Sequence, residues 1–268
     1  LHAMKRTLRL LAAAGFVAAS ASAHAQTEIQ WWHAMGGQLG EWVNGLAKGF
    51  NDSQKDFKVV PVFKGTYPET LTAGIAAFRA GTAPHILQVF EVGTANMMAS
   101  KGAIEPVSEV MKQAGVKFDA GVYVPAVAGY YTASNGQMLS LPFNSSTTVL
   151  HYNKDAFKAA GLDTEKPPAT WPEVALAAAK LKASGHKCPF TTTWASWTQL
   201  ENFSAWHNVE YSTKRNGFNG TDTRMAINTP LHVRHIENLA NMAQQGLFVY
   251  KGRDNAGDAT FQSGECAM

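Results

Sequence analysis

Hydrophobic and polar residues follow two different periods in the first hundred residues. Apolar, strand-like stretches occur at 28–33, 57–64 and 86–90. Helical patterns follow them, at 37–51, 68–79 and 93–100. In the first of these, apolar residues recur at i, i+3, i+4, i+7, i+8 and i+11 from Leu39 to Phe50, which is one face of an amphipathic helix. Strands that alternate with helices predict parallel strands with helical crossovers, and so an α/β fold.

The alternation resumes beyond residue 140. Further helices are predicted at 155–160, 171–184, 197–207 and 231–245. Strands are predicted at 147–152 and 188–193, and the last residues, 261–268, read as a turn that enters a strand. Thr170 and Glu173 have the spacing of a capping box at the start of one helix, and Gly185 follows its end.

Residues 1–25 have the pattern of a secretory leader. Residues 1–3 precede a better start at Met4, and we interpret them as an upstream artefact. A basic segment, an apolar run of about eight residues and an Ala-x-Ala site then predict cleavage after Ala25. A membrane anchor is the weaker interpretation, because the apolar run is too short for a ~30 Å hydrocarbon core. We therefore expect an exported protein.

The leader also accounts for the apparent basicity of the chain. It holds three of the 23 Lys and Arg residues and none of the 20 Asp and Glu residues, so the remainder carries 20 of each sign. Binding to nucleic acid needs a basic face that offsets phosphate charge. We therefore expect no nucleic-acid partner, whereas a small phosphorylated ligand needs only local donors.

Few residues suggest metal or catalytic chemistry. Cys188 and Cys266 lack a C-x-x-C spacing, which leaves two alternatives open, a disulfide or two buried thiols. His232 and His235 lie three apart on a predicted helix without an HExxH motif or a third ligand, so we expect a solvated helix face and no metal. The chain has no GxSxG elbow and no P-loop, and we expect no cofactor.

The most informative segment is LPFNSSTTVLHYNKDAF, at 141–157. Three small polar residues precede an apolar run, and Asn153 then signals a helix start. Together with LHYNKDAFKAAGLDTEKPPATWPEV (150–174) and TYPETLTAGIAAFRAGTAPHILQVFEVGTANMMASKGAI (66–104), this segment resembles the extracellular solute-binding proteins of the maltodextrin-binding type. These are capture subunits of ABC importers, and the resemblance is strongest to members that bind glycerol 3-phosphate.

The resemblance implies a two-lobe periplasmic binding protein fold of the α/β class. Residues 26–144 would form an incomplete lobe 1, and residues 145–268 a truncated lobe 2. Members of the family are longer, so we expect a C-terminally truncated fragment whose incomplete sheet exposes pairing edges. The implied ligand is sn-glycerol 3-phosphate or a glycerophosphodiester, bound in the periplasm. The implied partners are an ABC permease and its ATPase at the inner membrane.

Three of the family's ligand contacts match residues of this sequence, namely Tyr67, Glu91 and Ser146, with Ser145 beside the last. Such residues suit the ligand, because a carboxylate after a strand accepts hydroxyl donors while phenol and serine hydroxyls donate to phosphate. Each also has a simpler interpretation. Glu91 would be a helix cap, Tyr67 a loop aromatic packed on Pro68, and the serine pair a turn.

The chain has seven tryptophans, at 31, 32, 42, 171, 194, 197 and 206. The family places an aromatic residue against the glycerol moiety at Trp171, for which cap packing is the alternative. Trp32 is a weaker candidate for the ligand site. Trp42 falls in the apolar stripe of its helix and is assigned to the core, and His33 is expected to be a structural histidine.

Two other functions remain as alternatives. One is a receptor for sugars or oligosaccharides, because the shared scaffold does not fix the ligand. The other is a secreted hydrolase that acts on glycosides or phosphodiesters through Glu91 and Glu201. A receptor returns its ligand intact, whereas a hydrolase turns it over.

Overall fold

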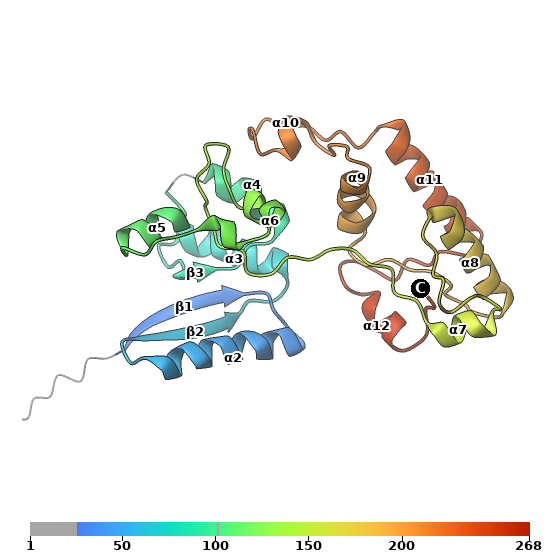
Figure 1. Ribbon diagram of the computed structural model, residues 1–268, viewed down its shortest axis with the longest axis horizontal. Helices are drawn as coiled ribbons and strands as arrows, with labels where there is room; N and C mark the ends of the chain where they lie inside the picture. The colour runs from blue at the N-terminus through green and yellow to red at the C-terminus, as the bar shows by residue number, and fades with distance from the viewer. Residues whose placement is uncertain (1–25, 101) are drawn as a thin grey trace, which may run out of the picture. The chain divides into compact units, whose positions relative to one another are not determined.

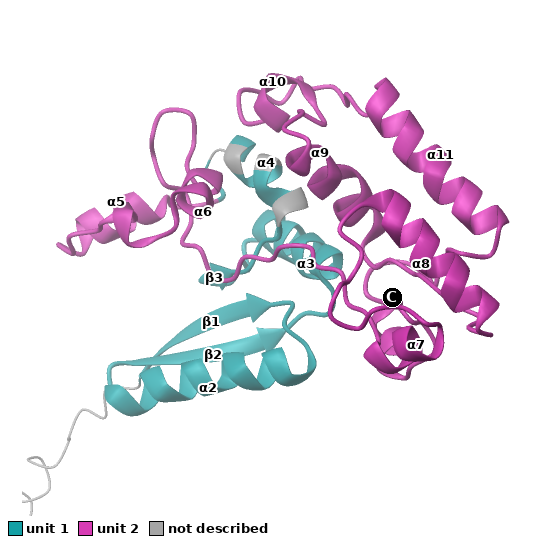
Figure 2. Cartoon of the chain, turned by 45° about the vertical axis from the view of Figure 1, so that its right-hand side comes forward, with its two compact units in different colours: residues 1–103 teal, residues 104–268 magenta. Residues whose placement is uncertain are grey.

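The computed structural model describes residues 26–100 and 102–268. The chain divides into two compact units, one that ends at Ala103 and one from Ile104 to Met268, here called unit 1 and unit 2 (Figure 2). The predicted lobe boundary between residues 144 and 145 falls inside unit 2 and stays a prediction. Within the described ranges, no helix is long and apolar enough to cross a membrane.

Unit 1 is built on a three-stranded parallel sheet. Its strands are β1 (Thr27–His33), β2 (Phe57–Phe63) and β3 (Ile86–Leu87), in the order β2-β1-β3. Trp32 of β1 pairs with Val62 of β2 and with Leu87 of β3. The parallel strands predicted from the sequence are confirmed, although β3 is shorter than the predicted stretch because residues 88–90 leave the ladder.

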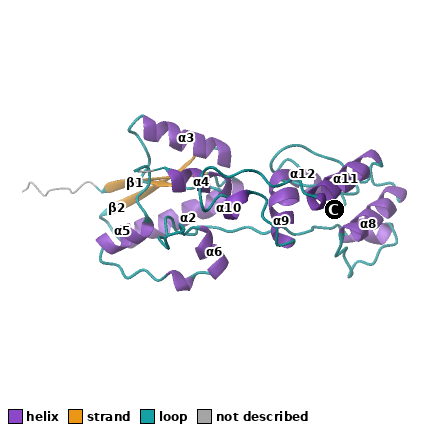
Figure 3. Ribbon diagram, turned by 90° about the horizontal axis from the view of Figure 1, so that it is seen from above, coloured by secondary structure: helices purple, strands orange, loops and turns teal. Residues whose placement is uncertain are grey.

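Three helices connect these strands and follow them. They are α2 (Gly37–Ser53), α3 (Tyr67–Arg79) and α4 (Glu91–Ala99). The helices α2 and α3 lie on opposite faces of the sheet (Figures 1 and 3). This arrangement follows from the strand order β2-β1-β3. The connection through α2 runs from β1 to β2, and the connection through α3 runs back in the opposite direction, past β1 to β3. Right-handed crossovers in opposite directions place their helices on opposite faces of the sheet.

Only a narrow strip of α2 is buried. Val43 and Ala47 are buried, whereas the other apolar residues of the predicted stripe, Leu39, Trp42, Leu46 and Phe50, are 44–54% exposed. The assignment of Trp42 to the core is therefore wrong. The helix packs against the edge strand β2, so a strip one residue wide reaches the sheet while the flanking positions of the stripe point away from it.

Unit 2 is mainly helical. Its helices are α5 (Val107–Gln113), α6 (Pro125–Tyr130), α7 (Lys154–Ala159), α8 (Trp171–Ala183), α9 (Asn202–Trp206), α10 (Thr213–Asn216), α11 (Pro230–Gln244) and α12 (Asp258–Gln262). A 3-10 turn, η1, spans Ala120–Val122, and a π-helical turn, η2 (Trp197–Glu201), leads into α9. The helix predicted over 197–207 thus begins as a π-helix.

The strands predicted in this unit do not form as regular ladders. Extended segments meet instead through single bridges that join Cys188 to Cys266 and Phe190 to Phe248. The backbone N–H of Asn153 donates to the carbonyl oxygen of Ala267 at 2.9 Å. These contacts give isolated bridges and no continuous ladder, so 147–152 and 188–193 are not regular strands, and the predicted final strand is reduced to the bridge at Cys266.

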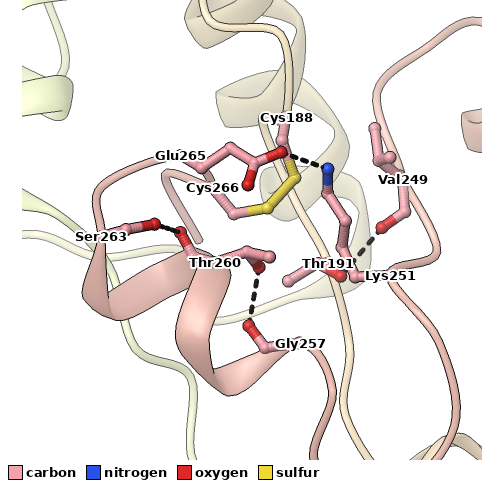
Figure 4. The surroundings of a disulfide bond; sticks show 9 residues. All are labelled: Cys188, Thr191, Val249, Lys251, Gly257, Thr260, Ser263, Glu265 and Cys266. Carbon is pink, nitrogen blue, oxygen red and sulfur yellow. Dashed lines mark hydrogen bonds and ion pairs between the residues drawn. A yellow bond between two sulfur atoms is a disulfide. The ribbon is translucent and has the colours of Figure 1, made fainter.

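The core of unit 2 gathers around these segments. Phe157 of α7, Leu181 of α8 and Met242 of α11 are almost fully buried. A disulfide joins Cys188 to Cys266, with their Cα atoms 4.5 Å apart (Figure 4). The alternative left open by the sequence is thus decided for a disulfide. The bond ties the segment after α8 to the segment after α12.

Candidate functional site

The carboxyl edge of the sheet in unit 1 contains a topological switch point. The chain leaves β1 toward β2 on one side and later returns to β3 on the other, and ligands of open α/β sheets bind where the order reverses in this way. Gln88 joins the two loops at this point. Its backbone N–H donates to the Trp32 carbonyl oxygen, and its side-chain Oε1 accepts from the Ala34 N–H, both at 2.9 Å.

Tyr67 is the first residue of α3 at the same edge. The helix start is fixed by the Glu69 carboxylate, which accepts from the Thr66 N–H at 2.7 Å and from the Thr66 hydroxyl at 2.9 Å. These hydrogen bonds, the backbone one first, lower the pKa of Glu69 below its ordinary value. The loop before them turns at Gly65, whose φ is +90°. The capped start of α3 therefore fixes the backbone position of Tyr67.

The ring of Tyr67 stacks on that of Phe90, with centroids 5.3 Å apart and planes 7° apart. Phe90 is the N-cap of α4, and Glu91 is the first residue of that helix. The structure thus brings Tyr67 together with the start of α4. The side chain of Glu91 lies outside the described part of the chain, so its predicted role stays a prediction. Tyr67 has a stacking partner in Phe90, which the sequence did not suggest.

Trp32 lies next to a cation that the sequence analysis missed. The Lys64 Nζ lies 3.7 Å from the centroid of the Trp32 ring. The indole Nε1 donates to Oε1 of Gln30 at 3.2 Å, which fixes the plane of the ring. Both Trp32 and Lys64 are half-buried. A lysine at a strand end usually indicates solvent exposure, and only the strand register identifies the aromatic neighbour.

His33 is a structural histidine, as predicted. It is buried, and its Nδ1 accepts a hydrogen bond from the Met35 N–H at 3.2 Å. In the neutral ring the proton is therefore on Nε2. Burial lowers the pKa of His33, so the ring stays uncharged at neutral pH.

The remaining candidates lie in unit 2. Ser145 and Ser146 are exposed, in a stretch that forms no helix or strand from residue 141 to 153. Trp171 is the first residue of α8, and its ring lies 6.0 Å from Phe190, edge to face, and 4.7 Å from His235. These contacts are the cap packing that was the alternative interpretation of Trp171. A ligand contact by any of these three residues stays a prediction.

His232 and His235 do not lie on a solvated face, contrary to the prediction. They are 1% and 5% exposed. The ring of His232 is held by two hydroxyls, Ser204 Oγ at 2.8 Å from Nε2 and Thr229 Oγ1 at 2.7 Å from Nδ1. The prediction failed because it treated histidine as a polar surface residue, whereas this helix turns its histidines toward buried hydroxyl and amide partners.

His235 extends the same cluster. Its Nε2 lies 2.9 Å from Gln199 Oε1, and Gln199 Nε2 donates to Thr192 Oγ1 at 2.9 Å. Burial, with smaller contributions from His207 and His232, lowers the pKa of His235 from 6.5 to about 4. We call His232, His235, Ser204, Gln199 and Phe203 the buried histidine network. It holds η2, α9 and α11 together.

The Ser204–His232 pair has the atom types of a nucleophile and its base, but it is structural. Ser204 and His232 are each 1% exposed, and the Ser204 hydroxyl also donates to the Leu200 carbonyl oxygen at 2.6 Å. A buried hydroxyl in this position has no access to a substrate. Among the residues that the structure describes, no group of three or more His, Cys, Asp and Glu side chains is placed to hold a metal ion.

The fold and the order of elements define a class of protein. Residues 36–268 match the family of bacterial extracellular solute-binding proteins, and the chain belongs to that family. Its curated relatives include the sn-glycerol-3-phosphate-binding periplasmic protein UgpB of Brucella abortus, 53% identical over 98% of this chain. The corresponding UgpB of Pectobacterium atrosepticum is 55% identical over the whole of this chain. The chain spans about 60% of the length of these relatives.

Solved structures agree on the fold. The crystal structure of UgpB from Mycobacterium tuberculosis in complex with glycerophosphocholine matches 91% of this chain and 61% of its own, with a TM-score of 0.72 and 20% identity. The GacH receptor of Streptomyces glaucescens matches 91% of this chain and 60% of its own, with a TM-score of 0.71 and 16% identity. The predicted α/β binding-protein fold is confirmed by these likenesses.

Proposed function

We propose that this protein is the substrate-binding subunit of an ABC importer and captures sn-glycerol 3-phosphate or a glycerophosphodiester in the periplasm. The observation that carries the proposal is its 53–56% identity, over 92–100% of the chain, to proteins named for binding glycerol 3-phosphate. The protein binds its ligand without breaking a bond, and delivers it intact to a permease and its ATPase. Cleavage of the leader after Ala25 accompanies export.

Each candidate residue has a role in this proposal. Glu91 accepts hydrogen bonds from the glycerol hydroxyls, and the Tyr67 phenol donates to the phosphate. The hydroxyls of Ser145 and Ser146 are further phosphate donors. Trp32 and Trp171 offer aromatic surface to the C–H groups of glycerol. The stacking of Tyr67 on Phe90, one residue before Glu91, supports the first two roles because it places both residues at one edge of the sheet.

The proposal is tested by isothermal titration calorimetry on a full-length chain, in which these 268 residues are continued by the region that the relatives have and this chain lacks. We expect one molecule of sn-glycerol 3-phosphate to bind per protein, and mass spectrometry to recover it unchanged. Release of glycerol or free phosphate would favour the hydrolase. Binding of maltotriose without binding of glycerol 3-phosphate would favour the sugar receptor.

The role of Glu91 is tested by Glu91→Gln. We expect a loss of affinity of about 10- to 100-fold, the range for one or two hydrogen bonds to a charged group. The matched control is Glu41→Gln, which makes the same change at an exposed position of α2. Equal affinities in the two variants would remove Glu91 from the ligand site and leave the receptor function in place.

A further inference from the structure

Lys64 is a cation at the carboxyl edge of the unit 1 sheet that the proposed function leaves unused. It directly follows β2, and its backbone N–H donates to the His33 carbonyl oxygen at the end of β1, at 2.9 Å. Trp32, Val62 and Lys64 share one face of the sheet, because Trp32 pairs with Val62 and Lys64 lies two residues further along. The ammonium group therefore has a fixed place next to the switch point.

The ammonium group of Lys64 contacts an aromatic ring, and no ion pair with a described carboxylate neutralises it. Its Nζ lies over the Trp32 ring at 3.7 Å, and within the described ranges no carboxylate forms an ion pair with it. Glu69 lies five residues after Lys64, but its carboxylate accepts hydrogen bonds from the backbone N–H and the hydroxyl of Thr66. A cation–π contact orients an ammonium group without neutralising it, so the positive charge remains for a ligand.

We propose that Lys64, positioned by Trp32, selects ligands that carry a phosphomonoester dianion. The inference rests on the proposed function and specifies the chemical class of its ligand. A phosphomonoester carries about −1.5 to −2 charges at neutral pH, whereas a phosphodiester carries about one. Because Coulomb energy scales with the product of the charges, a single ammonium group stabilises the monoester more strongly.

The same contact disfavours choline-bearing diesters. A quaternary ammonium group is recognised by a free aromatic face. In this protein the Trp32 face is already covered by the protein's own ammonium group, which also repels a second cation. Two effects therefore lower the affinity for glycerophosphocholine: its phosphate carries less charge, and the Trp32 face that could bind its choline group is covered by Lys64. Removal of Lys64 uncovers the ring and removes the repulsion.

The test compares two ligands, sn-glycerol 3-phosphate and glycerophosphocholine, by calorimetry on the full-length chain. We expect the unsubstituted protein to prefer glycerol 3-phosphate. In Lys64→Met its affinity falls by about tenfold or more, the effect of one charged hydrogen bond, and the preference shifts toward glycerophosphocholine. The matched control, Lys58→Met, removes the same charge from an exposed position of β2, six residues before Lys64 and on the same face of the sheet.

The readout is the ratio of the two dissociation constants in one sample, which does not depend on the fraction of folded protein. Lys64→Gln provides a second, polar variant for the same ratio. If the unsubstituted protein binds neither ligand, the receptor function itself is wrong. If it binds glycerol 3-phosphate but both Lys64 variants keep the ratio of Lys58→Met, the role of Lys64 is wrong and the receptor function stands. A preference of the unsubstituted protein for glycerophosphocholine would also overturn the role of Lys64.

Discussion

The imidazole ring of His235 lies face to face with the ring of Phe203, with centroids 3.9 Å apart and planes 10° apart. The ring of Trp171 is tilted against the same imidazole, with centroids 4.7 Å apart. A charged imidazolium in this place would face His207 and His232, both of which lower its pKa, and would meet no carboxylate among its described contacts. The network is therefore built around a neutral His235, and its stability depends on pH.

The first prediction concerns the stability of the protein in mild acid. The pKa of His235 is about 4 in the folded protein against 6.5 ordinarily, so between these values the unfolded chain binds more protons. The contribution of neutral His235 to the free energy of unfolding is therefore fully present above about pH 6.5. It decreases as the pH falls toward 4, by up to about 3 kcal/mol. Urea unfolding at pH 7, 6, 5 and 4.5 measures this loss.

The contribution of His235 is isolated by His235→Gln, which keeps a neutral donor for Gln199. We expect this variant to lose less stability between pH 7 and pH 5 than the unsubstituted protein. His186→Gln, a substitution outside the network, serves as the control. The same pH dependence in all three proteins would show that His235 is not the titrating group. His33, whose pKa is also lowered by burial, adds to the slope equally in each.

The second prediction concerns the hydroxyl that holds His232. In Ser204→Ala the buried Nε2 of His232 loses its partner at 2.8 Å. We expect the free energy of unfolding to fall by about 1–3 kcal/mol, the cost of an unsatisfied buried polar group. Chemical denaturation measures this change. The control is Ser196→Ala at an exposed position before η2, and a similar loss there would contradict the assignment.

The elements of unit 1 were predictable because their periodicity is strong. The helix α2 begins at Gly37 as predicted, and α3 ends at Arg79. The sheet order was not predictable, since it depends on which strands pair across the chain. Lys64 and Gln88 were missed for this reason. Each is an ordinary polar residue after a strand, and its significance comes from a neighbour in another loop.

In unit 2 the sequence predicted helices better than extended segments. The apolar run at 147–152 reads as a strand, but a strand needs a neighbour with matching register, and here only Asn153 donates to Ala267. The histidines of α11 were placed on the wrong face for a different physical reason. Burial of a polar ring costs less when its nitrogens have hydrogen-bond partners, as both do in His232 and Nε2 does in His235. Hydrophobic periodicity does not reveal such partners.

The third prediction concerns the disulfide. Cys188 and Cys266 are 1% and 0% exposed, and they close a loop with a sequence separation of 78 residues. Loss of the bond in Cys188→Ala/Cys266→Ala is expected to lower the free energy of unfolding by about 4 kcal/mol through the entropy of the unfolded chain. Urea unfolding with and without reductant measures it. A reduced protein, verified by thiol counting, with unchanged stability would refute this expectation.

The fourth prediction concerns the loop that carries Tyr67. Gly65 has a φ of +90°, and a Cβ on it would meet the Glu69 carboxylate at 2.2 Å. Gly65→Ala therefore strains the backbone and displaces the carboxylate that caps α3. We expect it to destabilise the protein by about 2–3 kcal/mol, which combines the strain with the lost cap. It should also weaken the binding of glycerol 3-phosphate, because the first turn of α3 places Tyr67.

Gly81→Ala separates these two effects. Gly81 follows the other end of α3 with a φ of +71°, and a Cβ there meets nothing within 4 Å. This variant therefore has the backbone strain without the displaced carboxylate, and we expect it to cost about 1 kcal/mol less than Gly65→Ala. Calorimetry on the full-length chain should give it the affinity of the unsubstituted protein. Equal losses of affinity in the two variants would mean that the capped start of α3 does not position Tyr67 for the ligand.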